Sequence, residues 1–539
     1  MFQSFFVDSI VNSFFCVFPE FFLLTMVIVL IVFAVITPPQ KKSYLLIQII
    51  RYINLTFFFI LIFYMLLLSL PIFATSKLTL LFCYQTLKLN QVLIYCKIMV
   101  IFFGLLALFQ LRRYLSLYQL TGYEYPLLIA IAVWSILIML SANNWLLLFL
   151  ALELQALCFV VLFAWNRRCE KAINASLKFV VINFMASTLI LLAFIEIILH
   201  TQSFIMPLIT VVVLYKEATQ WLWQFVGLLL ALGFAIKLGL VPFGFWLQDL
   251  FGAVTLPVLN FFSTAPKFTY IILVLSFYHD IFGHLNAIYF LQPFIFLGGL
   301  SILVANLVLF TIKNNLLNVI AWSSIANIGL LFWLFGICPQ ITLVIGFIMY
   351  YLIGTWFFMC LLQYIIVRDQ KSLHHPLYFS DLTVLRGSLS YYSLVVLVIF
   401  SLLNFFGIPP LAGFWSKFLV FKGLVTTLTI DNGWWFLILL FISLIGSFIY
   451  LRIFYSFLVE NINLKLNLVY FPATFDFLNI THTEWLTLFF VGYQVVLVIY
   501  LPILLLLVII LICSFYLICK LKNLGGSCFF SGFKRLQAL

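Results

Sequence analysis

Charged residues are scarce in this 539-residue sequence. Asp, Glu, Lys and Arg make up 8% of it, against 66% apolar residues and a mean hydropathy of +1.26. A soluble globular protein carries roughly 25% charged residues. The shortage excludes a soluble protein, and the continuous apolar runs exclude a membrane β-barrel, in which apolar and polar residues alternate. The sequence therefore predicts an all-α polytopic membrane protein.

Residue patterns that bind cofactors are also missing. The ten cysteines form no CxxC pair and no cluster with histidine, which argues against an iron–sulfur or zinc site in this chain. The six histidines fall in or beside predicted loops, so paired haem ligands within spans are not expected. Neither GxxxxGK[ST] nor GxGxxG entering a helix occurs, which argues against nucleotide binding and an ATP-driven pump. We expect no cofactor and no metal in this chain.

The net charge of +12 has a topological explanation. Most Lys and Arg lie in short loops between apolar runs, where they indicate membrane sidedness rather than nucleic-acid binding. The loops after the first, third, fifth, ninth and eleventh spans carry these residues, for example Arg112 and Arg113 after the third. This bias predicts that the odd-numbered loops face the inside.

Apolar runs long enough to cross a membrane number about fourteen. They lie near 19–37, 53–74, 91–111, 126–142, 145–165, 176–199, 221–241, 257–278, 290–311, 315–337, 341–366, 390–420, 433–458 and 487–518. Two of them share an interruption. Gly239-Leu-Val-Pro242 followed by Gly244-Phe-Trp246 recurs as Gly407-Ile-Pro-Pro410 followed by Gly413-Phe-Trp415. Paired Gly/Pro-interrupted helices in the two halves of a membrane protein indicate a binding or conduction region, although chance is an alternative.

Ionisable residues within the spans are the candidates for function, because a charge in hydrocarbon is costly. Glu153 lies in an apolar span, and a buried carboxylate stays ionised most readily beside an opposite charge. Lys237, directly before the first interruption, is the best partner. Burial disfavours the ammonium and a nearby carboxylate favours it, so movement of the carboxylate would make the lysine hold or release a proton. The alternative is a structural ion pair without a transport role.

Three more lysines lie in or near spans. Lys267 and Lys417 are candidates for the same proton path, with the alternative that each extends along the helix to the membrane surface. For Lys178, close to a basic loop, that extension is the preferred reading. Hydroxyls and amides could hold water between the lysines or simply bind helices together. These residues are Ser263, Thr264, Ser323, Ser324 and Asn327.

These stretches resemble the antiporter-like membrane subunits of respiratory complex I, and within that family the subunit 2 type. The resemblance is carried by LLLFLALELQAL, GFAIKLGLVPFGFWLQD, STAPKF, LLNVIAWSSIANIGLL and FFGIPPLAGFWSKFLVF, and covers roughly residues 120 to 460. Lys417 separates the chain from the subunit 4 type, where a glutamate is usual. Gly244 and Gln248 depart from the family pattern, which usually has His and Pro there, so the geometry after the first break is an open question.

The resemblance implies about fourteen transmembrane helices with two inverted five-helix repeats and discontinuous helices 7 and 12. It divides the chain into N-terminal helices 1–3 (1–120), a first repeat of helices 4–8 (121–285), a second repeat of helices 9–13 (286–460), and a loop with helix 14 (461–539). It also implies that Glu153, Lys237, Lys267 and Lys417 form a line of proton-transfer groups along the middle of the membrane.

The main hypothesis is a proton-translocating subunit of NADH:ubiquinone oxidoreductase in the mitochondrial inner membrane, or in a bacterial energy-transducing membrane. The resemblance places FMN, iron–sulfur clusters and ubiquinone elsewhere in such a complex. Expected partners are other membrane subunits and phospholipid, and no nucleic acid. One alternative is a free-standing cation/proton antiporter without NADH chemistry, and another is a structural scaffold that has kept the fold.

Overall fold

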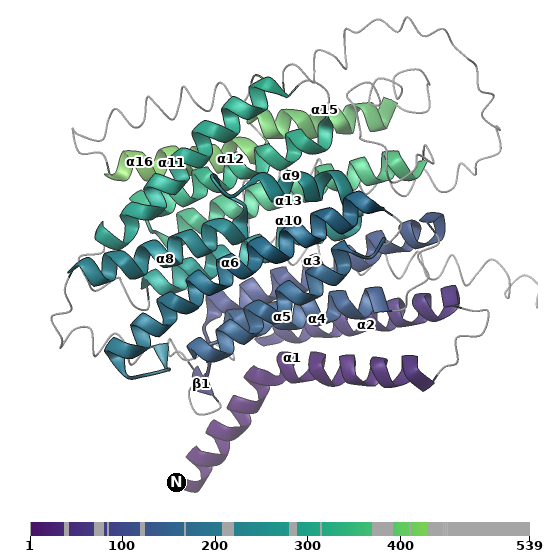
Figure 1. The fold of residues 1–539 in the computed structure, drawn as a ribbon. Coiled ribbons are helices and arrows are strands. Elements are labelled where there is room, and N and C mark those ends of the chain that lie inside the picture. The colour runs from purple at the N-terminus through teal and green to yellow at the C-terminus, as the bar shows by residue number, and fades with distance from the viewer. Residues whose placement is uncertain are drawn as a thin grey trace, which may run out of the picture.

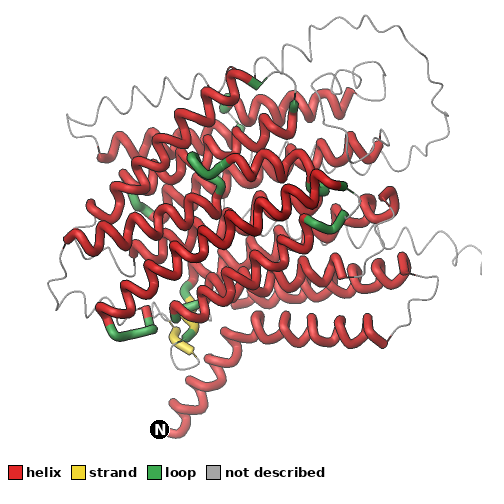
Figure 2. Tube along the Cα trace, viewed as in Figure 1, coloured by secondary structure: helices red, strands yellow, loops and turns green. Residues whose placement is uncertain are grey.

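The described residues fold into a bundle of helices (Figures 1 and 2). The structure, a computed structural model, describes residues 2–36, 43–68, 80–82, 86–118, 124–166, 169–206, 220–279, 288–312, 315–368, 392–408, 411–427 and the single positions 446, 448 and 450. These residues form fourteen α-helices and a two-stranded sheet, and ten of the helices are long and apolar enough to cross a membrane. The prediction of a mostly helical, multi-span membrane protein is confirmed. The predicted last span, near 487–518, and all but three residues of the one near 433–458 lie outside the described residues.

The first six helices build one side of the bundle. They are α1 (Phe2–Ile36), α2 (Ser43–Leu68), α3 (Gln91–Tyr118), α4 (Glu124–Ser141), α5 (Trp145–Phe163) and α6 (Glu170–Thr201). α1 contains Pro19, and its first part leaves the bundle at an angle (Figure 1), as expected where proline removes a backbone hydrogen bond. α3 continues to Tyr118, so the prediction that Arg112 and Arg113 lie in a loop is wrong.

A small hairpin packs against the connection between α4 and α5. Strands β1 (Leu80–Phe82) and β2 (Leu87–Leu89) pair antiparallel. The backbone N–H of Asn143 donates to the Thr86 carbonyl, and that of Met206 donates to the Asn143 carbonyl. The hairpin, the α4–α5 connection and the residues after α6 are therefore joined at one end of the bundle.

The remaining helices build the other side. They are α8 (Gln220–Leu238), α9 (Phe245–Ala253), α10 (Leu256–Phe277), α11 (Ile288–Thr311), α12 (Leu316–Ile337), α13 (Ile341–Arg368), α15 (Tyr392–Phe406) and α16 (Ala412–Thr427). α11 and α12 approach closely because Gly298 faces the α12 backbone, where an added Cβ would lie 2.6 Å from the Trp333 nitrogen. α12 is thereby held as a wall of the bundle beside α9 and α11.

α10 is the central helix. Every residue from Leu256 to Leu275 is buried, and the helix packs on α3, α4, α5, α8 and α13. A helix that is apolar on all sides is stable only when other helices or lipid surround it, and here protein surrounds it. The polar side chains on this part of α10 are consequently held inside the protein, away from lipid.

Candidate functional site

Glu153 and Lys237 form a loose ion pair between α5 and α8. Lys237 Nζ lies 3.9 Å from Glu153 Oε1, with side chains 1% and 20% exposed. The ammonium donates its hydrogen bond to Asn183 Oδ1 on α6, at 3.2 Å. Glu153 Oε1 accepts no hydrogen bond from any described residue. The pairing expected from the sequence is present, but the two charges do not touch, and a neutral amide holds the lysine.

The backbone around Lys237 explains why the helix stops there. α8 ends at Leu238, and Gly239 has a left-handed φ of +74°, which favours glycine. The N–H of Leu240 donates to the Ala235 carbonyl, closing the end of α8. A Cβ on Gly244 would lie 2.6 Å from the Gly239 carbonyl oxygen. Glycine therefore allows this tight turn, which places α9 directly after the break.

Lys267 lies near the midpoint of α10 and is 2% exposed. Its ammonium donates to Ser324 Oγ on α12 at 3.1 Å. Extension of this side chain to the membrane surface is therefore the wrong reading for Lys267. One turn further along α10, the Tyr270 hydroxyl donates to Gln155 Oε1 at 3.1 Å, two residues beyond Glu153 on α5. Polar contacts thus connect the central helix to α12 on one side and to α5 on the other.

Lys417 lies on the helix that follows the second interruption. It lies on α16, and its ammonium donates to the carbonyl of Phe406, the last residue of α15, at 2.8 Å. The carbonyls at a helix C-terminus carry partial negative charge, which stabilises a cation there. Gly407 has a left-handed φ of +88°, and the N–H of Gly413 donates to Asn404 Oδ1 at 2.7 Å. Lys417 is therefore held by the C-terminal end of α15.

The five polar residues proposed for water chains share one kind of contact. All five donate to carbonyls of their own helices, and Ser324 in addition accepts from Lys267. Sequence reasoning missed Asn183, Gln155 and Tyr270, which contact the candidate residues or lie beside them. The signal that could have found Asn183 and Gln155 is the same as for the charges, a polar side chain inside an apolar span.

Lys178 and Asp249 form a second ion pair that the sequence did not reveal. Lys178 Nζ on α6 lies 2.6 Å from Asp249 Oδ2 on α9, with side chains 59% and 42% exposed. Lys178 is more than half exposed, in keeping with the predicted extension outward. Its ammonium, however, contacts a carboxylate on the half-helix that follows the break.

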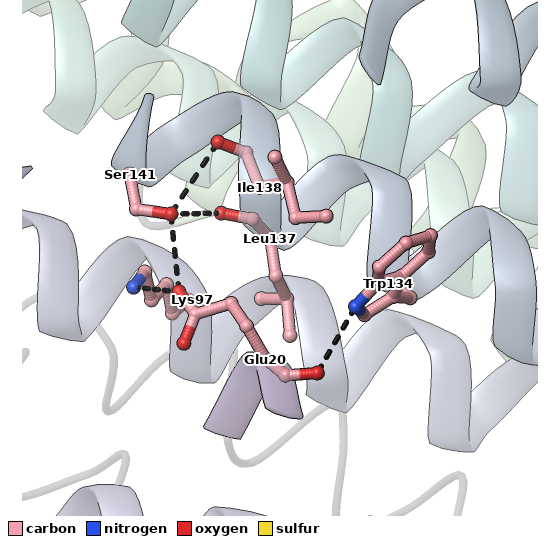
Figure 3. A network of polar contacts seen from close by, with 6 residues as sticks. All are labelled: Glu20, Lys97, Trp134, Leu137, Ile138 and Ser141. Carbon is pink, nitrogen blue, oxygen red and sulfur yellow. Dashed lines mark hydrogen bonds and ion pairs between the residues drawn. The ribbon is translucent and has the colours of Figure 1, made fainter. Parts of the chain in front are cut away.

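A third ion pair lies among the N-terminal helices (Figure 3). Lys97 Nζ on α3 contacts Glu20 Oε1 on α1 directly, and Ser141 Oγ on α4 donates to the same oxygen at 3.1 Å. Trp134 Nε1 donates to the Glu20 backbone carbonyl at 3.0 Å. The two charged side chains are 1% and 7% exposed. Glu20 and Lys97 are 77 residues apart in sequence, and neither was singled out as a site residue.

The chain matches a described family over residues 142–449, namely NADH:quinone oxidoreductase/Mrp antiporter, transmembrane. A relative named NADH-quinone oxidoreductase subunit N, from Pelagibacter ubique, is 26% identical over 73% of this chain and 78% of its own length. Subunit N 2 of Thermodesulfovibrio yellowstonii is 30% identical over 67% and 75%. NADH-ubiquinone oxidoreductase chain 2 of Arabidopsis thaliana is 29% identical over 62% and 64%.

Two solved structures are similar in fold. A chain of respiratory complex I from Thermus thermophilus matches with a TM-score of 0.64 at 20% identity, covering 82% of this chain and 90% of that one. A chain of the membrane-bound sulfane sulfur reductase, an archaeal respiratory membrane complex, matches with a TM-score of 0.67 at 16% identity, covering 93% and 96%. At these identities the likeness is one of fold.

Proposed function

Because the chain belongs to the NADH:quinone oxidoreductase/Mrp antiporter transmembrane family, we propose that it is the proton-translocating subunit N, or chain 2, of an NADH:quinone oxidoreductase. Several relatives bear those two names. The observation that supports a transport role is the Glu153–Lys237 pair, separated by 3.9 Å at the end of α8. Two charges without a direct contact can be moved apart at lower cost than two that share a hydrogen bond.

The proposed proton step begins at this pair. While Glu153 is near, its negative charge stabilises the Lys237 ammonium in the apolar interior. When Glu153 moves away, the ammonium keeps only the neutral Asn183 oxygen and releases its proton toward Lys267, which must be a neutral amine at that moment to accept it. Lys267 would then give a proton to Ser324 Oγ while the Ser324 hydroxyl, turned away from the Ala321 carbonyl to which it now donates, gives its own proton to the next acceptor, so that no charge stays on the serine. Lys417 is the last group of this line.

We extend the proposal to the finer architecture of two inverted five-helix repeats with discontinuous helices 7 and 12. In support, α8 and α9 are separated at a glycine with positive φ, and so are α15 and α16. Each break has a lysine nearby, Lys237 before the first and Lys417 after the second. The corresponding division places the repeats at residues 121–285 and 286–460, with 1–120 and 461–539 outside them.

The proposed setting is a large respiratory complex in the mitochondrial inner membrane, or in a bacterial energy-transducing membrane. FMN, iron–sulfur clusters and ubiquinone would be held by other subunits, and this chain would carry no redox centre. Apolar side chains such as Val35, Phe63 and Phe296 are more than 60% exposed, which suits contact with lipid or neighbouring membrane subunits. Phospholipid and those subunits are therefore the proposed partners.

Native gel electrophoresis of mildly solubilised membranes tests the assignment, with NADH dehydrogenase staining and detection of this chain. Co-migration with a very large NADH-oxidising band is the expected result. Migration in a smaller assembly without NADH activity would overturn it and favour a free-standing cation/proton antiporter, which the family description also covers.

Replacement of Glu153 by Gln tests the proton step. We expect the rate of proton pumping by the assembled complex to fall at least about tenfold. Positioned acid–base groups often raise a rate ~100-fold, and water can replace part of that contribution. Glu196→Gln is the matched control, because Glu196 is a partly exposed carboxylate near the end of α6. Full pumping by an assembled Glu153→Gln complex would remove Glu153 from the mechanism.

A further inference from the structure

α9, the nine-residue half-helix after the break, is held from two sides by adjacent residues. Asp249 Oδ2 pairs with Lys178 Nζ on α6 at 2.6 Å. Gln248 Oε1 accepts a hydrogen bond from Trp322 Nε1 on α12 at 3.0 Å. Successive residues on a helix point about 100° apart, so one turn of α9 reaches both neighbouring helices. Gln248 is one of the two departures from the family pattern, and here its amide binds α12.

Aromatic contacts give α9 the same two neighbours. The Trp246 ring lies 5.4 Å from that of Phe179 on α6, and the Phe245 ring lies 6.1 Å from that of Trp322 on α12. These contacts supply packing that does not depend on charge. Loss of the Lys178–Asp249 ion pair or of the Trp322–Gln248 hydrogen bond would therefore shift α9 rather than release it.

The two helices that hold α9 also hold the two central lysines. On α6, Lys178 is five residues from Asn183, whose amide oxygen accepts from Lys237. On α12, Trp322 is two residues from Ser324, whose hydroxyl accepts from Lys267. A displacement of α9 toward either helix would therefore be transmitted to the partner of one lysine.

We propose that Lys178, Asp249, Gln248 and Trp322 form a clamp, here called the α9 clamp, that sets the position of Lys237 relative to Lys267. This inference rests on the proton-translocating role proposed above. The four side chains act as positioning residues, because each works through α6, α9 or α12 and none is in the line of proton-transfer groups. The ion pair of the clamp is partly exposed, so we expect its removal to leave the fold intact.

The test compares variants of the ion pair in the assembled complex, reconstituted into vesicles. Lys178→Gln and Asp249→Asn each remove one charge at nearly constant size. We expect protons pumped per NADH oxidised to fall about threefold or more, because small misplacements of reacting groups are costly, while NADH oxidation with an artificial acceptor is unchanged. Lys178→Arg keeps the pair and should pump normally. Lys171→Gln, which removes an exposed charge from the first turn of α6, is the matched control.

The exchange variant Lys178→Asp/Asp249→Lys separates positioning from a general loss of charge. It restores the pair in the opposite sense, and we expect at least half of the coupling ratio to return. A third variant, Gln248→Leu, removes the acceptor for Trp322 at similar size and should lower the ratio without any change of charge. Normal coupling in Lys178→Gln, Asp249→Asn and Gln248→Leu would overturn the clamp, as would an exchange variant that assembles but pumps no better than the single variants.

The Glu153→Gln variant is measured in the same preparation to keep the two proposals apart. Lost pumping in Glu153→Gln together with normal coupling in the clamp variants would refute the clamp alone. Normal pumping in Glu153→Gln would refute the proposed proton step, whatever the clamp variants show.

Discussion

Two glutamate–lysine pairs in this protein have the same chemistry and different geometry. Glu20 and Lys97 touch, and Ser141 adds a second donor to the same carboxylate oxygen (Figure 3). Glu153 and Lys237 are 3.9 Å apart, and the lysine donates its hydrogen bond to the amide of Asn183 instead. Direct contact with an extra donor fixes a buried carboxylate, whereas a gap and a neutral partner leave it free to move. The comparison separates a pair suited to holding helices from one suited to switching.

The two pairs also lie in different parts of the bundle. Glu20 is on α1, whose membrane-crossing window is 39% buried, and the Trp134 indole also binds its backbone carbonyl. Helices in lipid gain little from hydrophobic burial against one another, so polar contacts carry more of their association. Glu153 instead lies within the family-matched region, beside the break after α8. The contacts of Glu20 therefore suit the attachment of α1, and those of Glu153 suit the transport role proposed above.

Replacement of Lys97 by Ala should have the largest effect. It leaves the Glu20 carboxylate buried without its cation, which typically costs about 3–5 kcal/mol. We expect the amount of assembled complex to fall sharply, as measured on native gels. The neutral pair Glu20→Gln/Lys97→Met should restore assembly with normal proton pumping. If that double variant assembles but does not pump, the pair takes part in transport and the comparison fails.

Replacement of Asn183 by Asp should convert the loose pair into a tight one. A carboxylate at this position would contact the Lys237 ammonium directly, and the lysine would keep its proton when Glu153 moves away. We expect pumping to fall about tenfold, or ~1.4 kcal/mol in the barrier, with assembly retained. Asn174→Asp adds the same charge at an exposed position on the same helix and should change neither proton pumping nor assembly. Equal effects of the two substitutions would show that charge, and not contact with Lys237, is responsible.

Sequence reasoning found the four candidate residues because a charge inside an apolar run is visible in one dimension. Glu153, Lys237, Lys267 and Lys417 each stand alone in such a run. The glycines at 239 and 407 marked the ends of α8 and α15 for a similar reason, since a positive φ is a local requirement. Most helices could be placed as well, because length and hydropathy suffice for a span.

Contacts between distant residues could not be predicted in this way. Asp249 pairs with Lys178, which is 71 residues away in sequence, and Trp322 donates to Gln248, which is 74 residues away. Which helices are neighbours depends on packing of the whole bundle, and a single sequence carries no direct record of it. The structure also shows local contacts that the sequence did not predict, a close backbone approach at Gly244 and a hydrogen bond from Trp322 to Gln248.

Replacement of Ser141 by Ala should have the smallest effect. It tests whether the Ser141 hydroxyl helps to fix the Glu20 carboxylate. The Ser141 hydroxyl lies within hydrogen-bonding distance of Glu20 Oε1 and of the Leu137 carbonyl, whereas Ser135 on the same helix bonds the Ala132 carbonyl. Both serines are buried, so Ser135→Ala removes an equal volume without touching Glu20. We expect Ser141→Ala to destabilise the complex by about 1 kcal/mol more than Ser135→Ala, seen as a lower temperature of thermal dissociation. Equal temperatures would mean that Lys97 alone holds the Glu20 carboxylate, and the extra donor would then not explain why this pair is fixed.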